Sequence, residues 1–218
     1  MRIQISSIVG LAAAWLLLTA ATAQPPLEDA VLQELNFARQ HPREYADELR
    51  DSRDFYDGNV FRRPDDPAGV LTQEGVTAVD EAIAFLERQA PLPPLAPGDI
   101  LALAARDHAV EQASGELGHA SPDGAMPGER VRRRGGDIYV GETIAYGPSD
   151  GRSVVRNLIV DDGVPGRGHR ALIFSNMYHY AGVGCGDHAR YHTVCVVDYA
   201  GTSDGNPVLP GAAQSASR

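Results

Sequence analysis

The sequence predicts an α+β domain in which helices precede and surround a small antiparallel set of strands. Three observations predict it. Apolar residues recur at helical spacing through the first half of the chain, two strand-like runs lie close together near its end, and the helix and strand patterns do not alternate as in a parallel α/β fold. The length of 218 residues suits one well-buried domain and is too short for several. We therefore expect a single domain over residues 24–200.

The first 23 residues have the pattern of a secretory signal peptide. Arg2 supplies a positive charge, residues 8–18 form an apolar stretch, and Ala21-Thr22-Ala23 is a small-residue cleavage site before Gln24. A retained membrane anchor is the alternative, but the apolar stretch is short beside the ~20 residues of a bilayer span. We expect a secreted product, periplasmic or extracellular, with no transmembrane segment after cleavage.

The first half of the mature chain reads as helical, with one irregular segment. Residues 51–74 mix charges, glycine and proline without a period, so we expect a surface loop or an insertion there. The proline-rich residues 91–98 separate two later helices, and Asp99 is placed to cap the second of these. The expected helices cover residues 28–40, a segment that begins at Pro42, residues 76–86 and residues 99–113.

The second half is richer in glycine and proline, and its elements are shorter. Its tail, residues 201–218, has the composition of a disordered end. The expected elements are short helices over residues 128–134 and 153–160, and strands over residues 138–146, 181–185 and 193–199.

The two cysteines, Cys185 and Cys195, favour a disulfide in an oxidising compartment, and the polar residues between them suggest that it staples a hairpin. A free or metal-binding pair is the alternative. Asp187, His188 and His192, between the cysteines, could form a second metal site, but a solvated hairpin tip is the simpler reading. The bridge is expected to be structural, without a redox function.

Composition and motifs exclude several classes of function. All 19 basic residues are arginine, which excludes lysine-dependent chemistry. The net charge of −10 argues against a nucleic-acid binder. The sequence has no Gly-x-Ser-x-Gly, no His-Glu-x-x-His and no phosphate-loop motif, and its glycine-rich segment at residues 182–186 lacks the spacing of a dinucleotide site. We therefore expect no nucleotide cofactor.

Two histidines, His119 and His169, lie next to glycines in segments expected to be loops. Imidazoles near carboxylates suit divalent-metal coordination or proton transfer, and Glu142, Asp161 and Asp162 are the acids that could join them. The alternative is that each histidine is a surface group or a hydrogen-bonded structural group. Sequence spacing alone does not decide between these readings.

Several ordered motifs resemble the CAP superfamily, the SCP-like extracellular proteins that include cysteine-rich secretory proteins, antigen 5 and plant pathogenesis-related proteins. The likeness covers about residues 30–200. The motifs are an opening Asn36-x-x-Arg39-x-x-Pro42-x-x-Tyr45-Ala46, then GHASPDG, GETIAYG, GRGHRALIF, AGVGCGDH and a final VCVVDYAG.

The resemblance implies an α-β-α sandwich, with a central antiparallel sheet between helical layers and a cleft that holds two histidines and two acids. His119, Glu142 and His169 match three of these positions. Glycines beside them would let the backbone approach closely or adopt positive φ.

The fourth position of the cleft is less well defined. Its acid usually follows a tryptophan by one helical turn. Here Leu158 occupies the tryptophan position, so that Asp161 is the match and Asp162 the alternative. Thr143 in place of the usual asparagine is a second departure from the family.

The resemblance implies a secreted binding module whose cleft binds zinc or another divalent metal, through His119, Glu142, Asp161 and His169, and a small-molecule, lipid or peptide ligand. A metal-dependent hydrolase is the first alternative, with His119 and His169 holding the ion and Glu142 activating its water. The second is a structural or cell-surface interaction protein, in which the same side chains only hydrogen-bond one another.

Overall fold

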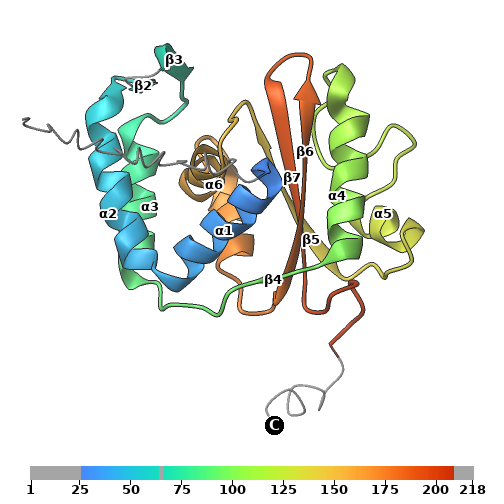
Figure 1. Cartoon of the computed structure of the whole chain (residues 1–218). Coiled ribbons are helices and arrows are strands. Elements are labelled where there is room, and N and C mark those ends of the chain that lie inside the picture. Colours follow the sequence, from blue (N-terminus) through green and yellow to red (C-terminus); the bar gives the residue numbers. More distant parts are fainter. Residues whose placement is uncertain (1–25, 64–65, 209–218) are drawn as a thin grey trace, which may run out of the picture.

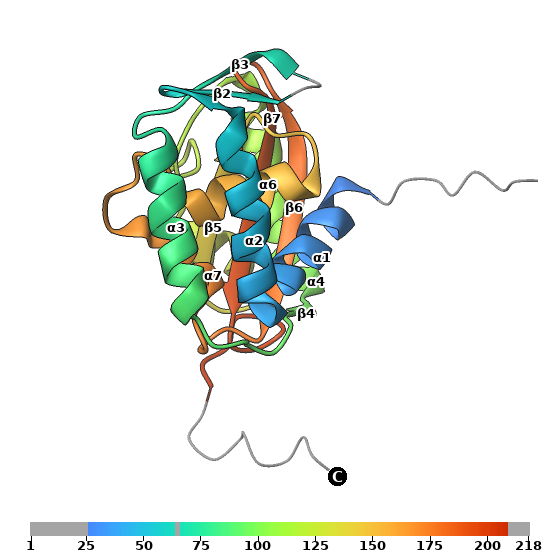
Figure 2. The ribbon, with the colours of Figure 1, turned by 90° about the vertical axis from the view of Figure 1, so that its left-hand side faces the viewer.

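The computed structural model describes residues 26–63 and 66–208, which form three layers. Figure 1 shows a sheet between two groups of helices. Figure 2 shows α2 and α3 in front of the sheet when it is viewed from one side. This is the predicted α+β sandwich. One layer contains α1 (Leu27–Gln40), α2 (Pro42–Ser52), α3 (Val76–Arg88), α6 (Gly151–Val160) and α7 (Gly168–Ile173), and the other contains α4 (Asp99–Glu111) and α5 (Pro127–Arg133).

The central sheet has the strand order β4-β6-β7-β5. The long strands β6 and β5 each pair antiparallel with β7, as predicted, and β5 is the edge strand that matters for the site. The two-residue strand β4 pairs parallel with β6 and was not predicted from the sequence. The strands are β4 (Ala96–Pro97), β5 (Val140–Tyr146), β6 (Tyr180–His188) and β7 (His192–Ala200).

Both faces of β7 are buried, because alternate side chains point to the two helical layers. One set belongs to the large core with α1, α2, α3 and α6, and the other packs against Ala105 and Ala109 of α4. The first set is Cys195, Val197 and Tyr199, and the second is Val194 and Val196.

Two glycines of β6 allow α4 to lie directly on the sheet. A Cβ on Gly182 would be 2.0 Å from the backbone nitrogen of Ala102, and one on Gly184 would be 2.2 Å from that of Arg106. No other residue fits this contact without moving the helix. The glycine-rich segment thus has a packing role.

The opening motif holds α1 to the rest of the fold. The side-chain amide of Asn36 donates to the carbonyl of Leu95 at 2.9 Å and its oxygen accepts the Leu95 N–H at 2.7 Å. The buried guanidinium of Arg39 donates to the carbonyls of Pro93 and Ile173, at 3.1 and 2.5 Å. Both residues therefore stabilise the fold.

The segment 51–74 differs from the loop that we expected. It contains the end of α2, a 3₁₀ turn (η1, Arg53–Phe55) and a three-stranded antiparallel sheet of β1 (Tyr56–Asp57), β2 (Val60–Arg63) and β3 (Asp66–Leu71). Figure 2 shows β2 and β3 at one end of the helical layer. Phe61 is buried against Tyr56, with ring centroids 4.9 Å apart, and anchors the segment.

Asp99 is not the cap that we expected. Gly98 occupies the N-cap position of α4, no side chain caps that end, and Asp99 lies in the first turn. The helix also ends at Glu111, before a 3₁₀ turn (η2, Gln112–Ser114). A third such turn, η3 (Pro165–Arg167), precedes α7. Asp99, in the first turn of α4, still complements the dipole of that helix.

The two ends of the chain are only partly described. The signal peptide predicted for residues 1–23 lies outside the described residues, as do residues 209–218. The start of the tail is not disordered as expected, because the carbonyls of Asp204 and Gly205 accept the N–H groups of Asp137 and Tyr139 at 2.9 and 3.1 Å. Across the described ranges, no helix has the length and apolar character needed to span a membrane.

Candidate functional site

His119 and Glu142 join the loop before α5 to the edge strand β5. The Nδ1 atom of His119 lies 2.7 Å from Oε1 of Glu142. When Glu142 is charged, it accepts a hydrogen bond from the Nδ1–H of His119. The lone pair of the neutral imidazole is then on Nε2. The side chain of His119 is 43% exposed and that of Glu142 is 1% exposed. The pair presents an imidazole to solvent and keeps the carboxylate behind it.

Arg130 of α5 completes the surroundings of Glu142. Its Nη2 atom donates to Oε2 of Glu142, and both side chains are buried. Its Nη1 atom donates to the carbonyls of His119 and Ala125, at 2.9 and 3.1 Å. One guanidinium therefore fixes both the carboxylate and the loop that carries His119. The sequence did not indicate Arg130, since it stands in a short run of arginines that resembles a solvated surface.

Asp198 is a second residue that the sequence did not indicate. It lies directly opposite Glu142 in the pairing of β5 with β7, and it is fully buried. Its carboxyl oxygens accept no hydrogen bond from the described residues. Burial first, and then the charge of Glu142, raise the pKa of Asp198 well above its usual range. The neutral acid is therefore favoured, and its proton can be donated to Glu142.

A buried histidine also supports the loop of His119. The ring of His108, on α4, contacts the carbonyl of Gly118 through Nε2 at 2.9 Å and Glu111 through Nδ1 at 3.0 Å. The hydroxyl of Ser121 donates to the same Glu111 at 2.6 Å. These contacts are made by residues on both sides of His119 in the sequence, so they hold the backbone of His119 in place.

His169 pairs with Asp161 in the same way. Its Nδ1 atom lies 2.7 Å from Oδ1 of Asp161, and its backbone N–H donates to Oδ2 at 3.0 Å. The side chain of His169 is 22% exposed and that of Asp161 is 1% exposed. The sequence predicted a loop at His169, but this residue lies in the first turn of α7, where Asp161 accepts a backbone N–H that has no partner within the helix.

The adjacent Asp162, our alternative to Asp161, faces another part of the molecule. Its two carboxylate oxygens accept the backbone N–H groups of Gln73 and Glu74, at 2.6 and 2.8 Å. The contacts of Asp162 thus connect the segment before α7 to the segment before α3. Of these two aspartates, Asp161 is the one that contacts His169.

The two pairs approach β5, the edge strand of the sheet, from its two faces, and the free edge is the place where their imidazoles could meet. A Cβ on Gly141 would be 2.8 Å from Leu172, which is one helical turn beyond His169 on α7. Side chains alternate along a strand, so Glu142 points to the other layer, where it contacts Arg130. The structure brings the four predicted residues together as two pairs. Within the part of the chain that the structure describes, no three His, Cys, Asp or Glu side chains are grouped to hold a metal ion.

A cavity of about 640 Å³ lies beside the first pair, and we call it the β5 cavity. Its wall includes His119 and Glu142. Its other side chains are mixed in character, since the apolar ones stand next to an acid and a base. They are Met126, Pro127, Ile138, Val140, Glu129 and Arg132. Met126 and Ile138 are exposed, so a ligand can reach apolar surface next to the imidazole.

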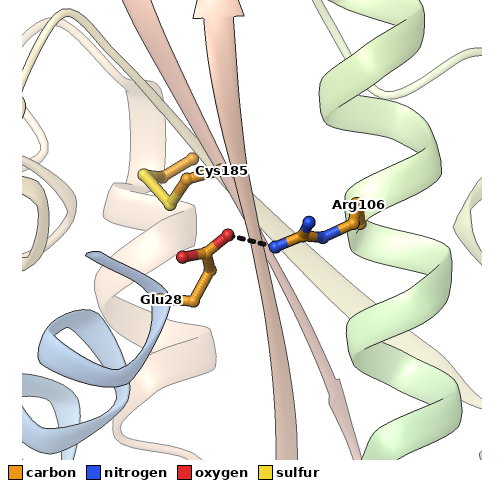
Figure 3. The surroundings of a disulfide bond; sticks show 4 residues. Glu28, Arg106 and Cys185 are labelled. Carbon is orange, nitrogen blue, oxygen red and sulfur yellow. Dashed lines mark hydrogen bonds and ion pairs between the residues drawn. A yellow bond between two sulfur atoms is a disulfide. The ribbon is translucent and has the colours of Figure 1, made fainter. Parts of the chain in front are cut away.

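The cysteines form the predicted disulfide, between directly opposed positions of β6 and β7. Figure 3 shows the bridge near the ion pair of Glu28 and Arg106, which joins the start of α1 to the middle of α4 across the sheet at 2.6 Å. Our expectation of a solvated hairpin tip is wrong for His188, which is buried and contacts the carbonyl of Glu116 at 2.9 Å.

A comparison with protein-family models identifies a family for this chain. The family model described as the cysteine-rich secretory protein family (CAP) matches residues 36–199. No curated protein matches the chain significantly.

Two solved structures are similar to parts of the chain. One is an extracellular protein containing an SCP domain from Bacillus anthracis str. Ames, with 22% identity and a TM-score of 0.43 over 59% of this chain and 38% of that chain. The other is an outer surface protein from Borrelia burgdorferi, with 18% identity and a TM-score of 0.41 over 50% of this chain and 77% of that chain. Since the family model spans most of the sequence, the chain belongs to the CAP family of cysteine-rich secretory proteins.

Proposed function

We propose that this chain is a secreted binding module in which His119 and His169 hold zinc or another divalent cation through their Nε2 atoms. One observation carries the proposal. Each imidazole reaches solvent, while its Nδ1 atom lies 2.7 Å from a buried carboxylate. A carboxylate behind Nδ1 fixes the tautomer and orientation in which Nε2 is a ligand, and metal-binding histidines usually have such a partner.

In this proposal, Glu142 and Asp161 orient the imidazoles and do not bind the cation. Both oxygens of Glu142 are engaged, by His119 and Arg130, and both oxygens of Asp161 are engaged, by the ring and the backbone N–H of His169. The protein then supplies two nitrogen ligands, fewer than in most zinc sites, so the affinity should be modest. A bound cation would supply a positive centre for an oxygen atom of a ligand.

The β5 cavity is the place where we expect such a ligand. Its volume of about 640 Å³ lies within the usual range of small-molecule sites. Apolar side chains beside His119 favour a small molecule or a peptide side chain that combines an apolar part with an oxygen donor.

Hydrolysis has less support from this geometry. A general base must reach the water whose proton it takes, whereas Glu142 is buried and already bonded on both oxygens. Substrate turnover that is lost in Glu142→Gln, with the metal retained, would favour the hydrolase instead.

Export is part of the proposal, since a disulfide-stapled member of this family needs an oxidising compartment. The secreted material should begin at Gln24, and its intact mass should be two hydrogens below that of the reduced chain. A product that still contains Met1 would contradict it.

Zinc titration by calorimetry tests the binding proposal. His119→Ala and His169→Ala should each weaken zinc binding by about tenfold or more, since each removes one of two protein ligands. His41→Ala is the matched control, because His41 also contacts a glutamate, Glu44 at 3.2 Å, but both side chains are exposed. Equal zinc binding by all four proteins, or none by the wild type, would overturn the proposal.

A further inference from the structure

A second cavity, of about 430 Å³, lies between α2, α6 and the small sheet of β1, β2 and β3. We call it the hairpin cavity. It shares no lining residue with the β5 cavity. Its lining includes Tyr45, Leu49, Phe55, Phe61, Arg152 and Arg156.

Tyr45 contributes an unsatisfied hydroxyl to this cavity. Its side chain is 1% exposed, and the hydroxyl has no hydrogen-bond partner among the described residues. Burial raises the pKa of Tyr45 well above its usual range, so the hydroxyl keeps its proton and remains a donor. Tyr45 lines the cavity, and the charges of Glu34, Glu48, Arg152 and Arg156 act on its hydroxyl, the last three from the cavity lining. A buried donor without an acceptor is costly and calls for a partner.

Arg156 is the cation of the cavity whose charge is not matched by a bonded acid. Its guanidinium lies 3.8 Å from the ring centroid of Phe61 and interacts with the hydroxyl of Tyr56. Within the described part of the chain it has no ion pair. The cavity's other arginines have acidic partners: Arg63 contacts Asp150 at 3.2 Å, and Arg152 contacts Glu48 at 2.6 Å.

We propose that the hairpin cavity binds a small monocarboxylate with an apolar body, whose carboxylate accepts hydrogen bonds from the Tyr45 hydroxyl and the Arg156 guanidinium. A guanidinium matches a carboxylate in shape and charge. One unmatched cation suits a monoanion better than phosphate, which carries up to two charges at neutral pH. Asp51 also lines the cavity, but it is exposed, so water screens its charge.

The walls of the hairpin cavity suit the apolar part of such a ligand. Leu49, Phe55 and Phe61 line it, and Phe55 is partly exposed. The volume lies within the usual range of small-ligand sites. This inference does not depend on the proposed metal site, because its residues come from α2, η1, β2 and α6.

Phenylacetate is a suitable probe, because it joins one carboxylate to one ring. The full secreted chain is titrated and followed by two-dimensional NMR, with phenylacetamide as the neutral analogue. We expect saturable binding of phenylacetate with a Kd of about 1 mM, as is usual for so small a ligand. Phenylacetamide should bind at least about tenfold more weakly, because it lacks the charge that Arg156 recognises.

Two variants test the residues directly. Tyr45→Phe removes only the unpaired hydroxyl, so the fold should be retained while phenylacetate binding weakens about tenfold. Arg156→Gln should weaken it by a similar factor. Tyr199→Phe is the matched control, because Tyr199 is also buried but its hydroxyl contacts Thr143 at 3.1 Å, outside the cavity. His119→Ala should leave phenylacetate binding unchanged, which separates this site from the proposed metal site.

Three results would overturn the proposal. In the first, the wild type does not bind phenylacetate. In the second, phenylacetamide binds as tightly as phenylacetate. In the third, folded Tyr45→Phe and Arg156→Gln bind phenylacetate as the wild type does.

Discussion

Asp161 holds His169 through two hydrogen bonds, one from the ring at 2.7 Å and one from the backbone N–H at 3.0 Å. Asp161 ends α6 with φ of 59°, in the left-handed region that aspartate and asparagine adopt more readily than most residues. One side chain thus fixes both the start of α7 and the orientation of the imidazole.

Replacing Asp161 by asparagine separates these two roles. Asp161→Asn keeps the backbone preference and an acceptor for the N–H of His169, but it removes the charge that holds the Nδ1 proton. We expect zinc affinity to fall about tenfold, with little change in the thermal midpoint. Asp162→Asn is the matched control, because Asp162 does not contact His169. Calorimetry should show wild-type zinc binding for Asp162→Asn, and an equal loss in both variants would refute the assigned role.

The buried pair of Glu142 and Arg130 predicts a large stability effect. Glu142→Gln leaves the buried guanidinium without a carboxylate, which should cost about 3–5 kcal/mol in the free energy of unfolding. Glu142→Gln combined with Arg130→Met should recover part of this loss, since no charge is then left unpaired. Urea denaturation measures both variants. Asp123→Asn breaks an exposed pair with Arg133 and serves as the control, with little change expected. A Glu142→Gln protein as stable as the control would contradict the account.

Asp198 predicts a stability that falls as the pH rises. Its pKa is raised in the folded state, so the folded protein holds a proton that the unfolded chain has lost, from about pH 4 upward. Asp198→Asn keeps a donor for Glu142 and removes this proton uptake. The variant should therefore gain stability relative to the wild type between pH 4 and pH 7. Thermal unfolding of Asp198→Asn and of the wild type at pH 4 and at pH 7 measures the difference in stability between the two proteins. The same difference at both pH values would show that the pKa of Asp198 is not raised in the folded state.

Glu74 predicts the opposite dependence. Hydrogen bonds from Arg167, and from the backbone N–H of Gly163, lower its pKa from 4.5 to about 2. A lowered pKa stabilises the fold above the unfolded value, and this contribution is lost as the pH falls from about 4.5 toward 2. Glu74→Gln should therefore have a flatter acid limb in a plot of thermal midpoint against pH. Parallel curves for variant and wild type would exclude this role for the ion pair.

The sequence predicted the longer elements well, because their period extends over enough residues to be recognised. The stripe of Val31 and Leu35 is buried in α1, and the valines of β7 alternate between two cores. The strands of the segment 51–74 contain two to six residues each, too few to establish a period. Their position depends on the burial of Phe61, which the sequence does not reveal.

The site was predictable only in part. The motifs indicated His119, Glu142 and His169, and the structure brings His119 into contact with Glu142. Adjacent residues such as Asp161 and Asp162 cannot be distinguished by spacing, because the left-handed backbone at the end of α6 decides which carboxylate faces His169. Arg130 and Asp198 meet Glu142 only through the packing of α5 and the pairing of β5 with β7.

The central claim is that His119 and His169 share a cation through their Nε2 atoms, with the carboxylates behind them. Anomalous diffraction at the zinc absorption edge, from crystals of the mature protein grown with zinc, tests it most directly. We predict one peak at about 2.1 Å from both Nε2 atoms, with Glu142 and Asp161 still on the two Nδ1 atoms. A peak on the carboxylates, a peak on only one of the two imidazoles, or no peak near either would contradict the claim.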